Sequence, residues 1–129
     1  MTKERHFKKE YADELLRIAR SDLESAEVLA KGAIKRKENI LFHVGQAIEK
    51  ALKAKLCAKG EPVPLTHDLA VIIDRFSVTD KLPHSDELDD LSQFATIRRY
   101  EEGAAILTAE EISTALVIGK NILDWAEKK

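Results

Sequence analysis

A chain of 129 residues with a net charge of −2 is long enough for one domain with a single core, and it lacks the excess of basic residues that duplex DNA binding needs. Hydrophobic residues make up 44% and charged residues 34% of the sequence, with five Gly and three Pro, a composition typical of a helical bundle. The single cysteine, Cys57, excludes an internal disulfide. Because no apolar run approaches the ~20 residues of a membrane span and no signal-peptide core is seen, we expect a cytoplasmic protein without a membrane segment.

The charge is distributed unevenly along the chain. Residues 1–60 carry 14 Lys/Arg and 9 Asp/Glu, a net charge of +5, whereas residues 61–129 carry 7 and 14, a net charge of −7. This asymmetry favours head-to-tail or antiparallel association, or an anionic ligand on the basic half. Solvated helix faces would give the same pattern.

The first half of the chain predicts two long helices. Residues 1–10 are expected to be a flexible segment, and residues 11–129 a single domain. Apolar residues at three- and four-residue intervals predict a helix over 11–31 that stops at Gly32. A second helix is expected over 39–59, with Asn39 as its N-cap and Gly60 at its C-terminal end.

The second half predicts one short helix and two longer ones. Thr66 is expected to cap the short helix and Ser85 a fourth helix, with a break at Gly103. Thr108 and Glu111 have the spacing of a capping box for the last helix. The predicted fold is all-α, an antiparallel four-helix up-and-down bundle with one additional short helix.

Three polar side chains of the second predicted helix share one helical face. His43, Gln46 and Lys50 stand at positions i, i+3 and i+7, beside an apolar stripe. Such a row supplies either a binding surface or a hydrogen-bonded seam between helices.

The sequence Arg98-Arg99-Tyr100 is the second candidate for binding. Two guanidiniums and a phenol can hold phosphates and contact a base, although the same groups can pair with neighbouring acids. His67 and Asp68 are adjacent and do not face each other on a helix, so capping and loop anchoring are the simplest role for them. The His and Cys residues lack the spacing of metal ligands, and no cofactor-binding motif is present.

The second helix and the loop after it resemble the HEPN domain family. Members typically show an F-H-x-x-Q-x-x-E-K-A-L-K segment, then a glycine loop and T-H-D-L. The matching residues here are Phe42, His43, Gln46, Glu49, Lys50, Ala51, Leu52 and Lys53, then Gly60, Thr66, His67, Asp68 and Leu69.

The resemblance implies a homodimer that acts with a minimal nucleotidyltransferase in a toxin–antitoxin-like system. HEPN proteins of this type often carry an arginine–tyrosine element where Arg98, Arg99 and Tyr100 stand. It therefore implies a non-catalytic nucleotide- or partner-binding module. In such a module the anionic groups of the ligand would contact Arg98, Arg99, Tyr100 and Lys50. The pocket or the dimer seam would be lined by His43, Gln46 and His67.

An alternative reading is a metal-independent RNase toxin. Catalytic members of the family carry arginine, four to six intervening residues and histidine, but no histidine follows Arg98 or Arg99 at residues 103–106. Arg36 and His43 fit the bare spacing across a turn and the start of a helix, away from the matching region. The RNase reading therefore needs a histidine from elsewhere in the fold or from a second subunit. A third reading is a dimeric helical adaptor without a ligand.

Overall fold

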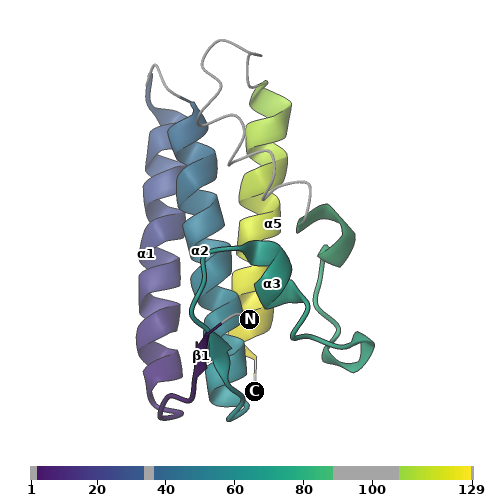
Figure 1. Cartoon of the computed structure of the whole chain (residues 1–129). Helices are drawn as coiled ribbons and strands as arrows, with labels where there is room; N and C mark the ends of the chain where they lie inside the picture. The colour runs from purple at the N-terminus through teal and green to yellow at the C-terminus, as the bar shows by residue number, and fades with distance from the viewer. Residues whose placement is uncertain (1–2, 34–36, 89–107, 129) are drawn as a thin grey trace.

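The chain is mostly helical, as predicted, in a computed structural model that describes residues 3–33, 37–88 and 108–128 (Figure 1). The long helices match the predicted ranges to within one residue at each end. The elements are β1 (Glu4–Arg5), α1 (Tyr11–Lys31), α2 (Glu38–Ala58), β2 (Val63–Pro64), α3 (Leu69–Ile73), the 3-10 turn η1 (Val78–Asp80) and α5 (Ala109–Glu127).

Helices α1, α2 and α5 stand side by side and enclose the core. Helix α1 runs antiparallel to α2 and α5, and the short α3 lies against α2 (Figure 1). Helix α2 is the most deeply buried, because apolar side chains occupy most of its circumference. Its buried apolar residues are Ile40, Leu41, Val44, Ala47, Ile48, Ala51, Leu52, Ala54, Leu56 and Cys57.

The fourth predicted helix is described only at its beginning. Residues 85–88 are helical, and the carbonyl of His84 accepts hydrogen bonds from the backbone N–H groups of Glu87 and Leu88. The predicted continuation and the break at Gly103 lie outside the described residues. The four-helix up-and-down arrangement therefore stays a prediction.

The helix ends follow local hydrogen bonding. Gly60 has a φ of +76°, and its N–H and that of Glu61 close the end of α2 onto the carbonyls of Cys57 and Leu56. This is the Schellman arrangement, in which glycine takes the left-handed position without a steric cost. The capping box of Thr108 and Glu111 is confirmed at the start of α5.

Three predicted caps are wrong. Ser85 is already the first helical residue of its segment, so it does not hold the N-cap position. Asn39 lies inside α2, which begins one residue earlier. Thr66 does not cap α3; the Asp68 carboxylate accepts from the N–H of Ala70, and the Thr66 hydroxyl accepts from the N–H of Asp68. The N-cap is therefore two residues later than the sequence pattern indicated.

The N-terminal residues pair with the segment that follows α2. Strand β1 runs antiparallel to β2, with Glu4 opposite Pro64, and the N–H of Leu65 donates to the carbonyl of Lys3 at 2.7 Å. The Cys57 thiol donates to the carbonyl of Lys8, and burial raises the pKa of this thiol. The division into residues 1–10 and 11–129 remains a prediction.

The turn η1 is attached to both α2 and α5. The Lys59 ammonium lies 2.5 Å from the Asp80 carboxylate, and the indole N–H of Trp125 donates to the Asp80 carbonyl at 3.0 Å. Phe76 packs edge-on against Trp125 with ring centroids 5.5 Å apart. These contacts close one end of the core.

We expect Asp80 to make stability fall at acid pH. The hydrogen bond from Lys59, followed by that from the Ser77 N–H, lowers the pKa of Asp80 below its ordinary value of 3.8. A carboxyl whose pKa is lower when folded stabilises the protein above the unfolded pKa and loses that contribution as the pH falls through the folded one. Urea unfolding below pH 3.8 should therefore show a smaller pH dependence in Asp80→Asn than in the native chain. Equal pH dependence in both proteins would contradict this.

Candidate functional site

Part of the polar row on α2 forms a seam with α1. The Lys50 ammonium donates to the Gln46 amide oxygen at 2.8 Å and lies 3.4 Å from the Asp22 carboxylate. The side chains of Lys50 and Asp22 are 24% and 23% exposed, so this ion pair lies partly buried between the helices. Lys50 therefore joins α2 to α1, and Gln46 holds its ammonium from the same helix. The predicted ligand-binding role of both residues stays a prediction.

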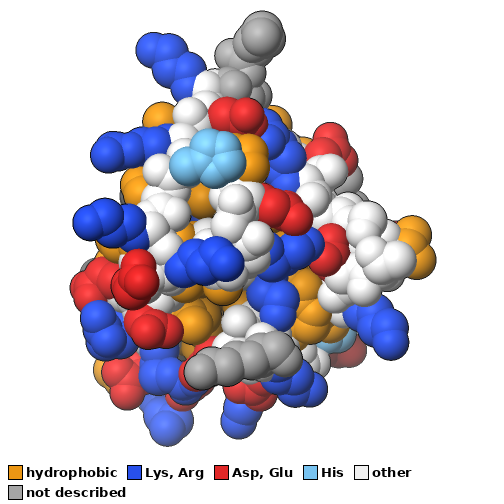
Figure 2. Space-filling model, turned by 90° about the horizontal axis from the view of Figure 1, so that it is seen from below, with side chains coloured by type: hydrophobic (Ala, Val, Ile, Leu, Met, Phe, Trp, Pro, Cys, Tyr) orange, Lys and Arg blue, Asp and Glu red, His pale blue; other side chains and the backbone are white. Residues whose placement is uncertain are grey.

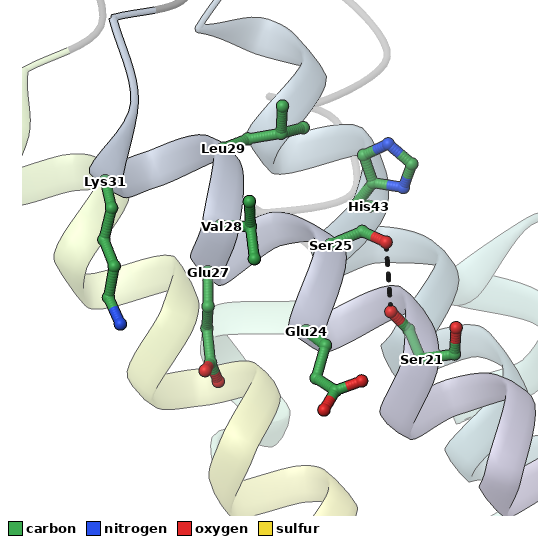
Figure 3. A pocket seen from close by; sticks show the side chains of 8 residues that line it. All are labelled: Ser21, Glu24, Ser25, Glu27, Val28, Leu29, Lys31 and His43. Atoms are coloured by element: carbon green, nitrogen blue, oxygen red, sulfur yellow. Dashed lines mark hydrogen bonds between the residues drawn. The ribbon is translucent and has the colours of Figure 1, made fainter.

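His43, two turns from Lys50 on α2, lines an open pocket of about 750 Å³ on the α1/α2 face (Figure 3). Its ring packs edge-on against Phe42, with centroids 5.5 Å apart. Its Nδ1 atom is buried and has no hydrogen-bond partner among the described residues. Buried polar atoms normally have partners, so this ring nitrogen is an unsatisfied polar group of a residue that lines the pocket. The lining residues are Ser21, Glu24, Ser25, Glu27, Val28, Leu29, Lys31 and His43.

The lining of this pocket carries more acidic than basic groups. Glu24 and Glu27 project in the same direction from α1 (Figure 3). Lys31 supplies the one ammonium group among the lining residues. The Ser25 hydroxyl donates to the Ser21 carbonyl at 3.1 Å, and Val28 is 68% exposed. Two carboxylates repel a phosphate and attract a basic side chain, and the exposed valine offers apolar contact.

His67 lies outside this pocket and contacts α2 on another face. Its Nδ1 atom is 2.9 and 3.1 Å from the two carboxylate oxygens of Glu49, and the Lys53 ammonium is 3.0 Å from the same carboxylate. The partner of His67 is thus Glu49, 18 residues away, and the neighbouring Asp68 caps α3. The predicted capping and loop-anchoring role is confirmed for Asp68.

The structure groups the predicted residues only in part. Gln46 and Lys50 bond to each other and His43 lies along the same face, whereas His67 is separate. Arg98, Arg99 and Tyr100 lie outside the described residues. Sequence reasoning did not single out the pairing of Glu49, because His67 lies 18 residues away along the chain.

Within the described ranges, no three His, Cys, Asp or Glu residues are grouped as a metal site would require. Basic and acidic side chains are interspersed over the face seen in Figure 2. None of the described helices is long and apolar enough to cross a bilayer.

Comparison with known proteins gives one match. The sequence model of the HEPN domain matches residues 12–129, nearly the whole chain. Searches of curated proteins and of solved structures gave no significant match.

Proposed function

The chain belongs to the HEPN domain family, and on this premise we propose that it is a non-catalytic binding module whose α1/α2 face takes a protein partner. The observation that carries the proposal is the unpaired Nδ1 of His43 beside a pocket lined by Glu24 and Glu27. A basic side chain of the partner would pair with the carboxylates, and a hydrogen-bond donor would satisfy His43.

The seam beneath this face supports the proposal. Lys50 is held by Gln46 and Asp22, so α1 and α2 are fixed relative to each other next to the pocket. A surface held in its bound geometry loses less entropy on association. In this role Gln46 and Lys50 position the face, and His43 contacts the partner.

The partner that we propose is a minimal nucleotidyltransferase, acting with this chain in the cytoplasm as part of a toxin–antitoxin-like pair. A second copy of the chain would form a homodimer, to which the charge difference between its two halves contributes. A nucleotide, if it is the ligand, would bind at Arg98, Arg99 and Tyr100, because guanidiniums suit phosphates better than the acidic pocket does.

Thermal unfolding in the presence of ATP, GTP or AMP tests the nucleotide branch. A ligand at one hundred times its Kd stabilises a one-site protein by about 2.7 kcal/mol, which gives a measurable rise in Tm. We expect this rise in the native chain and its loss in Arg98→Ala/Arg99→Ala. If none of the three nucleotides changes the Tm, nucleotide binding is excluded, and partner binding remains the proposed function.

An RNA-cleavage assay without metal ions tests the non-catalytic character. We expect no cleavage by the purified chain, because no histidine follows Arg98 or Arg99 at the family's catalytic spacing. Cleavage that both Arg99→Ala and His43→Ala abolish would overturn the proposal in favour of an RNase with an unusual or cross-subunit site.

A further inference from the structure

A buried carboxylate lies directly beneath an exposed imidazole on the side of α2 that carries Glu49. Glu49 is 3% exposed, and among the described residues it is the one charged residue that is buried. The Lys53 ammonium donates to the Glu49 carboxylate at 3.0 Å, and the Nδ1 atom of His67 lies 2.9 Å from the same carboxylate. The His67 side chain is 85% exposed, whereas that of Glu49 is 4% exposed.

The contact anchors the loop to α2, and the loop has further attachments. Residues 63–68 are already held by the β1–β2 pairing, by the bond from the N–H of Leu65 to Lys3, and by the capping bonds of Thr66 and Asp68. A side chain that remains 85% exposed adds little apolar burial to that attachment. The imidazole is therefore available for another use.

The contact fixes the chemistry of the ring. When neutral His67 donates its Nδ1–H to Glu49, the lone pair is on Nε2, which is then the nitrogen that can act as a nucleophile. The Lys53 ammonium forms an ion pair with the same carboxylate at 3.0 Å. A nucleophile oriented by a buried carboxylate is the arrangement used in covalent catalysis by histidine.

We propose that His67 is a phosphoryl-acceptor site. Its Nε2 lone pair attacks the phosphorus of a phosphoryl donor such as phosphoramidate, in the form whose nitrogen already carries three hydrogens; an N–P bond forms, and the P–N bond of the donor breaks. The donor nitrogen keeps the bonding pair and leaves as ammonia. The ring gains a positive charge, which the Glu49 carboxylate stabilises through the Nδ1–H. The site is separate from the α1/α2 face and does not depend on the proposed partner.

The test is incubation of the full chain with potassium phosphoramidate at mildly alkaline pH, followed by peptide mass spectrometry under conditions that preserve acid-labile phosphohistidine. His6, an exposed histidine of the same chain, is the internal control. We expect His67 to gain one phosphoryl group about 10-fold faster than His6, because the buried carboxylate stabilises the charged product. Equal rates at His67 and His6 would overturn the proposal.

Two variants extend the test. Glu49→Gln keeps an acceptor for the Nδ1–H but removes the negative charge, so we expect the His67 rate to fall about 10-fold with the His6 rate unchanged. A folded Glu49→Gln chain with an unchanged His67 rate would contradict the proposal. If removal of the buried charge prevents folding, the ratio of the two rates within the native chain decides the outcome. His67→Gln should abolish the adduct and leave the Tm within about 2 °C of the native value.

Discussion

Leu52→Ala is expected to lower the free energy of unfolding by about 2–5 kcal/mol. Leu52 lies in the middle of α2 and is fully buried, at 0% exposure. Truncation removes its apolar contacts with the surrounding helices and leaves a cavity that the packed bundle can only partly fill. Urea unfolding followed by circular dichroism measures the change.

Leu65→Ala is the matched control, because the same atoms are removed from a side chain that is 51% exposed. We expect its effect to stay under about 1 kcal/mol. A similar loss in both variants would mean that α2 is not the centre of the core.

If the proposed nucleotidyltransferase is the partner, Glu24→Lys/Glu27→Lys is expected to weaken its binding by about 10–100-fold. Both carboxylates line the pocket beside His43 and both are exposed, so reversal of their charge places like charges against the partner without burying them. Isothermal titration of the purified proteins gives the affinity, and the Tm of each variant shows that the fold is intact.

Asp124→Lys is the control for charge reversal outside the pocket, and it is compared with the single variant Glu24→Lys, because both change the net charge by the same amount. Asp124 is exposed on α5, outside the pocket lining, and we expect its replacement to leave the affinity within about 3-fold of the native value. Equal weakening by the control would indicate long-range charge steering, and an unchanged affinity in the double variant would exclude the pocket as the binding face.

Local sequence patterns predicted the helices because their signals lie within a few residues. The apolar spacing of α1 gave its observed bounds, Tyr11–Lys31, and the capping box at Thr108 depends on a residue only three positions away. The cap at Thr66 failed because Asp68, a residue of equally suitable type, stands two positions later. The cap at Asn39 failed because α2 begins after Lys37, which makes no side-chain capping bond.

Contacts between distant segments could not be read in the same way. Strands β1 and β2 are two residues each, too short to show an alternating pattern. The pairing of Glu49 with His67 joins a helix to a loop 18 residues away, and the acidic pocket near His43 combines residues of α1 and α2. The sequence identified His43 and His67 as candidates, but it could not show that they lie in different environments.

Co-purification of the tagged chain from its native host, with mass spectrometry of the bound chains and small molecules, tests the central claim most directly. We predict recovery of a small nucleotidyltransferase with the native chain and its loss from Glu24→Lys/Glu27→Lys, because the acidic pocket is the contact that we propose. Recovery of RNA fragments with cyclic-phosphate ends, or of a homodimer without any other bound molecule, would contradict the account.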